Sequence, residues 1–235
     1  MIDYPLLTGD WTTPGGHPVS FTYREGTNDW NTLSSTMAPT DEYHLPRGLS
    51  GVALDVGAYL GSVAVGLALD NPDLRVFAIE PVPDNIALIR RNLDLNGVSV
   101  VLIEGAAGDG SPVDVWYRYR GTPSLEHHAF VGNSSLAYDH GGEYEHETVT
   151  YTSISLASFI ERFGRIDWLK IDCEGGEFAF LDSPAIGDVG YIIGEWHSVR
   201  GYTRADLRAL LDATHDVTFD HDDDTTGGFV AVRRG

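Results

Sequence analysis

From residue 51 onwards, short apolar runs alternate with segments that carry helical patterns. The runs have the length typical of buried strands; they cover residues 51–56, 75–79, 98–103, 167–171 and 191–194. The segments between them predict helices at residues 60–69, 83–96, 156–163, 177–181 and 204–211. Strands that alternate with helices over this length predict an α/β fold of three layers with a mostly parallel sheet.

The last two apolar runs, at residues 217–219 and 229–232, follow a different pattern. Only the polar stretch 220–228 separates them, which is too short for a helical crossover, so they predict an antiparallel hairpin. A mostly parallel, Rossmann-like sheet that ends in such a hairpin resembles the class I methyltransferase fold. The sheets of dinucleotide-dependent dehydrogenases, in contrast, usually continue in parallel.

The sequence predicts an N-terminal arm and one larger domain. Residues 1–50 are rich in Thr, Pro, Gly and aromatic residues without sustained periodicity. They predict an irregular arm with short strands, packed on a domain that spans residues 51–235. Within that domain, alternating positions in residues 112–156 predict extra strands or a lid.

Acidic residues dominate the charge of the chain. It has 235 residues with 35 acidic and 15 basic side chains, a net charge of −20, and such a field repels phosphate backbones and anionic lipid. We therefore expect neither nucleic acid nor a membrane surface as a partner. The single cysteine excludes an internal disulfide, and no apolar run approaches the ~18 residues that span a bilayer. Without an N-terminal signal pattern, these features predict a cytoplasmic protein and leave its oligomeric state open.

The turn after the first strand is where open α/β sheets bind ligands. Gly57 permits a tight backbone turn there, and Gly61 lets the following helix pack closely while its free N–H groups point at an anion. A dinucleotide fingerprint requires glycine at the position of Tyr59, because a pyrophosphate needs backbone without a side chain. Tyr59 therefore argues against NAD as the cofactor.

Candidate cofactor contacts follow the next two strands. Glu80 ends the second strand, from where a carboxylate can accept hydrogen bonds from both hydroxyls of a ribose. Residues 104–109 follow the third strand and are small enough to line a flat slot for an adenine ring, with Asp109 accepting from its exocyclic amine. The glycine turn, the helix and the acid at the strand end together predict a cofactor that contains adenosine.

Several motifs resemble those of the FkbM family of S-adenosylmethionine (SAM)-dependent methyltransferases. They lie at residues 54–61, at Glu80-Pro81, above all at residues 169–177, and in the arm at residues 24–30 and 42–43. The resemblance runs from about residue 20 to 197, and Cys173 stands where a β-branched residue is usual. It implies SAM as the cofactor and O-methylation of a hydroxyl on a small molecule, often a sugar, a polyketide or another natural-product scaffold.

The resemblance also implies where SAM is held. Asp55 and the backbone around Gly57 would bind its methionine end, Glu80 the ribose, and Ala107 with Asp109 the adenine. The expected cofactor-binding residues are Asp55, Gly57, Ala58, Gly61, Glu80, Pro81, Ala107, Asp109 and Asp172.

The acceptor hydroxyl needs help from a base or a metal, because its pKa is comparable to water's ~15.7. His197 is the expected general base, and Asp172 and Glu174 are further catalytic candidates. Asp172, Glu174 and Glu195 are expected at the ends of adjacent strands, where three carboxylates could hold Mg²⁺. Alternatively, Lys170 neutralises part of this cluster and Asp172 only orients the acceptor.

An acceptor pocket is expected from the aromatic and histidine side chains between the third and fourth strands. These are Tyr117, Tyr119, His127, His128, Phe130, Tyr138 and His140. Two alternative functions remain open. One is an NAD-dependent oxidoreductase, opposed by Tyr59 and the closing hairpin, and the other is a noncatalytic SAM-binding or scaffold protein.

Overall fold

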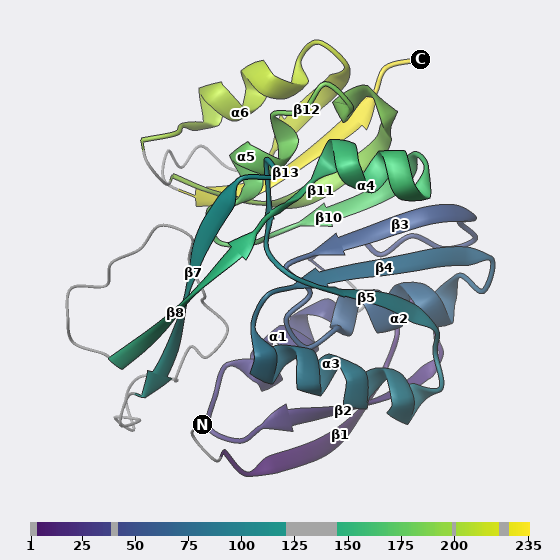
Figure 1. The fold of residues 1–235 in the computed structure, drawn as a ribbon. Helices are drawn as coiled ribbons and strands as arrows, with labels where there is room; N and C mark the ends of the chain where they lie inside the picture. The colour runs from purple at the N-terminus through teal and green to yellow at the C-terminus, as the bar shows by residue number, and fades with distance from the viewer. Residues whose placement is uncertain (1–3, 39–41, 121–144, 199–200, 221–225) are drawn as a thin grey trace.

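A seven-stranded sheet with the order β12-β13-β11-β10-β3-β4-β5 forms the centre of the molecule (Figure 1). The structure, a computed structural model, describes residues 4–38, 42–120, 145–198, 201–220 and 226–235. The strands of the sheet are β3 (Gly51–Val56), β4 (Leu74–Glu80), β5 (Val100–Glu104), β10 (Ile166–Ile171), β11 (Val189–His197), β12 (His215–Phe219) and β13 (Thr226–Arg233).

The strand directions match the sequence pattern. β10 pairs in parallel with β3 and β11, and β4 pairs in parallel with β3 and β5. β13 is antiparallel to both β11 and β12, so the predicted C-terminal hairpin is confirmed. In this register Val56 lies opposite Ile79 on one side and Ile171 on the other. The carboxyl ends of β3, β4 and β10 therefore meet at one edge of the sheet.

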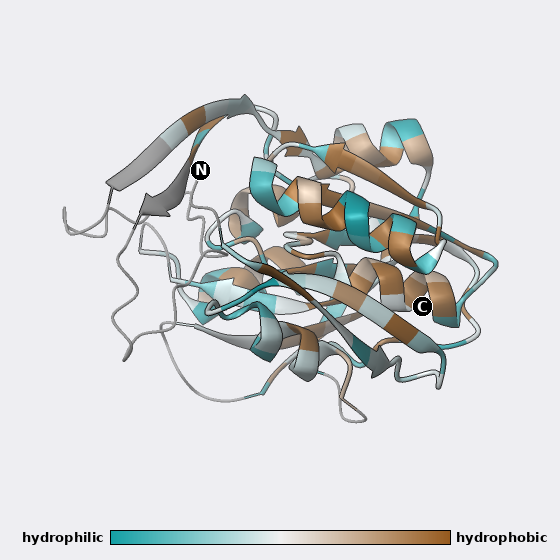
Figure 2. Cartoon of the chain, turned by 90° about the horizontal axis from the view of Figure 1, so that it is seen from below, coloured by the Kyte–Doolittle hydropathy of each residue, from teal (hydrophilic) through white to brown (hydrophobic). Residues whose placement is uncertain are grey.

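Helices cover both faces of the sheet, which confirms the three-layer α/β fold. One face carries α2 (Ser62–Asp70) and α3 (Pro83–Asn96), and the other carries α4 (Leu156–Phe163), α5 (Glu177–Leu181), the 3₁₀ helix η1 (Ile186–Asp188) and α6 (Arg204–Leu211). Each face has its own core: Leu54 of β3 belongs to the α4 side and Ala53 to the α2 side. Figure 2 shows apolar residues along these strands and helices. Burial on both faces explains why most residues of the central strands are apolar.

Local signals mark the ends of several helices. α3 begins at Pro83, whose missing N–H is not needed in a first turn, and ends where Gly97 adopts φ = 61°. The side chain of Ser155 caps α4 by accepting from the backbone N–H of Ser158 at 3.2 Å. A capping box between Thr203 and residue 206 opens α6. These ends could be located from sequence because the residues that make them are close in the chain.

The N-terminal arm is more regular than the sequence pattern indicated. It forms an antiparallel hairpin of β1 (Leu6–Thr12) and β2 (Pro18–Arg24), followed by α1 (Asp29–Thr36). β2 is fastened to α3, because Asn92 Oδ1 accepts from the backbone N–H of Thr22 at 2.7 Å. The prediction of an irregular arm missed α1, in which Leu33 is the one buried large apolar residue.

A second hairpin projects from the body within residues 112–156, where extra strands or a lid were expected (Figure 1). Its strands are β7 (Pro112–Arg120) and β8 (Glu145–Thr152), beside the short pair β6 (Ala107–Gly108) and β9 (Ile154–Ser155). Five residues of the expected acceptor pocket lie outside the described residues: His127, His128, Phe130, Tyr138 and His140. Across the part of the chain that the structure describes, no helix has both the length and the apolar character needed to cross a membrane.

Candidate active site

The turn between β3 and α2 brings three chain segments together. Gly57 has φ = 75°, and a Cβ atom at this position would collide with the backbone carbonyl oxygen of Asp172. The N–H groups of Gly57 and Ala58 both donate to the carbonyl oxygen of Ile79, at 3.0 and 3.1 Å. Glycine is therefore required at residue 57, because the turn is pressed between the ends of β4 and β10.

The carboxylate of Glu80, the last residue of β4, is fixed beside this turn. Its Oε2 accepts from the backbone N–H of Tyr59 at 2.9 Å, and its Oε1 accepts from Val82 N at 3.0 Å and from Asn85 Nδ2 at 3.1 Å. Burial raises the pKa of this carboxyl above its ordinary value, although the three hydrogen bonds oppose the rise. A carboxylate offers about four acceptor sites, so Glu80 retains capacity for a ligand.

A cavity of about 780 Å³ opens beside the Gly57 turn and Glu80. Most of the residues expected from the sequence lie in its wall. They are Gly57, Ala58, Glu80, Pro81, Ala107, Asp172, Glu174, Glu195 and His197. Most of the residues expected to bind the cofactor and the candidates for catalysis thus share one cavity.

Three expected cofactor-binding residues do not line this cavity. Asp55 is fully buried one residue before the end of β3, where the pleat of the strand turns it into the core. Asp109 is exposed, and its Oδ1 accepts from the N–H of Ser111 at 2.8 Å within its own turn. Gly61 has φ = 79° and precedes α2. The direct ligand contacts expected of Asp55 and Asp109 are therefore not supported by their positions.

Lys170, the single lysine of the chain, lies buried in β10 beneath the turn. Its Nζ donates to the carbonyl oxygens of Gly57 at 2.7 Å and Val56 at 3.2 Å, and lies 3.4 Å from Asp55 Oδ1. Burial alone would lower the pKa of Lys170, but the charges of Asp55 and Asp172 raise it above its ordinary value. The ammonium group is therefore charged and supports the turn from below.

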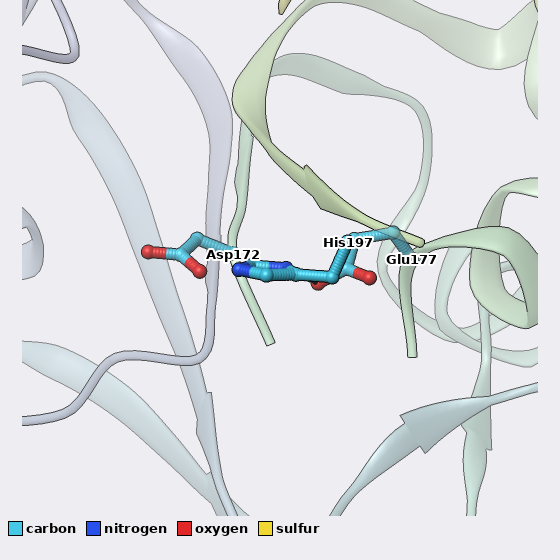
Figure 3. A group of neighbouring side chains, drawn as sticks. All are labelled: Asp172, Glu177 and His197. Carbon is cyan, nitrogen blue, oxygen red and sulfur yellow. Dashed lines mark hydrogen bonds and ion pairs between the residues drawn. The ribbon is translucent and has the colours of Figure 1, made fainter. Parts of the chain in front are cut away.

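His197, at the end of β11, lies beside the carboxylates of Glu177 and Glu174. Figure 3 shows His197 with Glu177. Its Nδ1 lies 3.3 Å from Glu177 Oε1, and its Nε2 lies 3.6 Å from Glu174 Oε2. Burial alone would lower the pKa of His197, but the hydrogen bond to Glu177 and the charges of both glutamates raise it to about 10. A histidine that is protonated at neutral pH has no site for another proton, so this geometry does not support His197 as the general base.

Glu174 has the character that a base near neutral pH requires. Its backbone φ of 56° lies in the left-handed region, and its side chain is 29% exposed in the cavity wall. Burial and the charge of Asp172 raise the pKa of this carboxyl to about 7, although His197 lowers it. A carboxylate with a pKa near the working pH is well matched to proton transfer.

A compact group of possible metal ligands differs from the group expected from sequence. Ligand atoms of Asp172, Glu177 and His197 all lie within 4.8 Å of one another (Figure 3), whereas Glu174 and Glu195 were expected beside Asp172. The Glu177 carboxylate is buried and already accepts two backbone N–H groups from the turn after β10. Mg²⁺ prefers oxygen ligands to an imidazole nitrogen. This group therefore fits Mg²⁺ poorly, and Mg²⁺ at Asp172, Glu174 and Glu195 stays a prediction.

The N-terminal arm contributes site residues that the strand pattern did not identify. The hydroxyl of Tyr43 donates to Asp172 Oδ2 at 2.9 Å, and burial with the charge of Asp172 raises the pKa of Tyr43 well above its ordinary value. Tyr59 donates its O–H to Asp29, a buried residue at the start of α1. Hydroxyl and amide side chains around α1 complete the cavity wall: Asn28, Asn31, Thr32, Ser35 and Thr36. In the sequence, the family resemblance of the arm was the signal that pointed to this region.

Comparisons with known proteins place the chain among methyltransferases. Over 57 residues, 24% of the chain, it is 39% identical to release factor glutamine methyltransferase of Geobacter sulfurreducens, and the match spans 20% of that protein. A methyltransferase FkbM from Methylobacillus flagellatus has a TM-score of 0.52 and 17% identity, over 84% of this chain and 47% of the other. A precorrin-6y C5,15-methyltransferase from Geobacter metallireducens has a TM-score of 0.47 and 16% identity, over 87% of each chain. At 17% identity, the likeness to the Methylobacillus protein shows the fold alone.

A match between this sequence and the model of a protein family identifies the family. The model of the methyltransferase FkbM domain matches residues 55–221, well over half of the chain. The matched range contains the Gly57 turn, Glu80 and the end of β10, which form part of the cavity wall described above. The chain therefore belongs to the FkbM methyltransferase family.

Proposed function

We propose that the cavity binds SAM and that the protein transfers its methyl group to a hydroxyl of a small molecule. The observation that carries this proposal is the carboxylate of Glu80, fixed by three hydrogen bonds at a strand end beside the Gly57 turn. A ribose offers two hydroxyl donors to a carboxylate in this position. Membership of the FkbM methyltransferase family supports the same cofactor.

The charge of the cavity favours a cationic cofactor over a dinucleotide. The acids in its described wall are Glu42, Glu80, Asp172, Glu174 and Glu195. The two cations, Lys170 and His197, are already engaged by backbone carbonyls or carboxylates. Such a wall attracts a sulfonium ion and repels a pyrophosphate. Tyr59 also lies in the wall where a dinucleotide motif has glycine, so the oxidoreductase alternative is disfavoured.

The chain offers surfaces for each part of SAM. Backbone groups of Gly57 and Ala58 would contact the methionine end, and Glu80 would accept from the ribose. Ala106, Ala107 and Val115 give an apolar wall that suits an adenine ring, in place of the contact once expected from Asp109. When bound, SAM would supply an electrophilic methyl group. The protein must then hold the acceptor oxygen in line with it, which is worth effective molarities of ~10⁵ M or more.

Glu174 is the residue that we assign as the base for the acceptor hydroxyl. Its carboxylate has a pKa of about 7 and lines the cavity. His197 does not take the proton in this scheme; its charge keeps part of the Glu174 population ionised, since it lowers the pKa of that carboxyl. Asp172, held by Tyr43, would accept a hydrogen bond from the acceptor and orient it.

Transfer of a labelled methyl group from SAM to a panel of hydroxylated small molecules tests this proposal. We expect transfer by the wild type and a loss of about 10²–10⁴ in rate for Glu174→Gln, because a general base contributes on that scale. Asp109→Asn is the matched control, since Asp109 is an exposed acid outside the cavity. SAM binding without transfer to any hydroxyl would instead favour the noncatalytic alternative.

A further inference from the structure

Tyr59 has an unusual backbone conformation in the turn of the cofactor cavity. Its φ of 53° lies in the left-handed region, which disfavours an L-residue with a bulky side chain by roughly tenfold. The two other left-handed positions of this turn, Gly57 and Gly61, are glycines. In this conformation the N–H of Tyr59 donates to Glu80 Oε2 at 2.9 Å. Something outside the turn must therefore offset the cost of the conformation.

The side chain of Tyr59 is tied to the N-terminal arm. Its hydroxyl donates to Asp29 Oδ1, and the guanidinium carbon of Arg24 lies 5.4 Å from the centre of its ring. Burial and the charge of Asp29 raise the pKa of Tyr59 well above its ordinary value, so the phenol keeps the proton that it donates. The ring thus has a polar anchor and a cationic neighbour in the same segment.

Asp29 is itself held rigidly. Arg24 donates to Asp29 Oδ2 from both its Nε and its backbone N at 2.8 Å, and to Oδ1 from Nη2 at 3.0 Å. The Asp29 side chain is fully buried, and that of Arg24 is 5% exposed. A buried, bidentate ion pair of this kind restricts the movement of both side chains. Both residues precede the range that matches the FkbM domain.

We propose that Asp29 is a positioning residue of the cofactor site. Anchored by Arg24, it holds Tyr59 in the left-handed conformation and so keeps the Tyr59 N–H on the Glu80 carboxylate. The inference rests on the proposed function, because it treats Glu80 as the residue that binds the ribose. It means that the arm sets the affinity for the adenosine part of SAM, although Asp29 does not line the cavity.

Binding of S-adenosylhomocysteine to Asp29→Asn, measured by calorimetry, tests this link. We expect the affinity to fall about tenfold, because the binding-competent turn becomes a minor conformer. Asp70→Asn is the matched control: Asp70 is also buried and also accepts hydrogen bonds from the arm, from Thr13 and Gly15, but within the described part of the chain it makes no hydrogen bond with Tyr59. It should lower the melting temperature and leave affinity within about twofold of the wild type. Equal losses of affinity in both variants would overturn the proposal.

A double-mutant cycle with Tyr59→Phe separates positioning from general destabilisation. If Asp29 acts through the phenol of Tyr59, then Asp29→Asn changes the affinity of the Tyr59→Phe protein by no more than about twofold. A full tenfold loss in that background would show that Asp29 acts by another route.

Hydrogen exchange of the Tyr59 amide in ligand-free protein distinguishes failure of this inference from failure of the proposed function. We expect faster exchange in Asp29→Asn than in the wild type or Asp70→Asn, because the Tyr59 N–H then leaves Glu80. If the wild type does not bind S-adenosylhomocysteine, the proposed function fails, while the exchange rates still decide whether Asp29 holds the turn. Unchanged exchange in Asp29→Asn would overturn the inference even if the wild type binds.

Discussion

Replacing His197 by glutamine tests the charge state on which the proposed chemistry depends. Glutamine retains an amide that can donate to Glu177 but carries no charge. In the wild type, the hydrogen bond to Glu177 and the neighbouring carboxylates overcome burial and raise the pKa of His197 from 6.5 to about 10. Between pH 6.5 and about 10, His197 therefore keeps a proton in the folded protein that it loses in the unfolded chain.

The size of the effect follows from that difference in pKa. One pKa unit corresponds to about 1.4 kcal/mol, so the rise from 6.5 to about 10 sets a ceiling of about 5 kcal/mol on the contribution of this proton. Since Glu174 shares the charge and is 29% exposed, we expect about 2–3 kcal/mol. The folded-state pKa is raised, so the contribution is complete below pH 6.5 and is lost as pH rises through about 10.

Urea unfolding of the wild type and His197→Gln across this pH range measures the loss. The free-energy difference between the two proteins should shrink steadily as pH rises. His215→Gln is the control, because burial lowers the pKa of His215. The contribution of His215 is therefore present above its unfolded pKa and is lost only in acid, so its difference from the wild type stays flat at alkaline pH. A constant difference for His197→Gln would refute the charged state and make His197 available as the general base.

Three further predictions follow from the same cavity. Glu174→Gln should abolish the rise in methyl-transfer rate near pH 7, because the base with a pKa of about 7 is gone; a profile that keeps this rise would exclude Glu174 as the base. Treatment with EDTA should leave the rate unchanged, because Glu174 is assigned as the base and not as a ligand of Mg²⁺, and recovery of a lost rate with Mg²⁺ would contradict this. Lys170→Met should lower the free energy of unfolding by about 3 kcal/mol, because it leaves Asp55 buried and unpaired. Adding Asp55→Asn should recover part of that stability in urea unfolding, and no recovery would show that the pair does not support the turn.

The sheet and most helices could be predicted from sequence because their signals are local. β3 is a mostly apolar run that ends just before Gly57, and α3 lies between Pro83 and Gly97. α1 could not be predicted in the same way. It buries Leu33 and the charged Asp29, and the burial of Asp29 depends on Arg24, which belongs to the strand before it.

Residues of the candidate site could be predicted where the strand order alone sets their positions. They could not be predicted where the direction or the charge of a side chain determines its role. Adjacent parallel strands bring Gly57 and Glu80 to one edge, and their positions follow from the strand ends. The direction of Asp55 depends on the pleat of β3, which the pattern does not resolve. The charge of His197 depends on Glu174 in the turn after β10 and on Glu177 at the start of α5, so the sequence of β11 alone does not indicate it.

Binding of SAM by Glu80 and the Gly57 turn is the step on which the proposed function rests. Its most direct test is a calorimetric titration of the wild type and Glu80→Gln with S-adenosylhomocysteine, with NAD as the competing ligand. We expect the wild type to bind S-adenosylhomocysteine but not NAD, and Glu80→Gln to bind S-adenosylhomocysteine at least about tenfold more weakly. A wild type that does not bind S-adenosylhomocysteine at millimolar concentration, or a Glu80→Gln protein that binds it as tightly as the wild type, would show that Glu80 and the Gly57 turn do not form a SAM site.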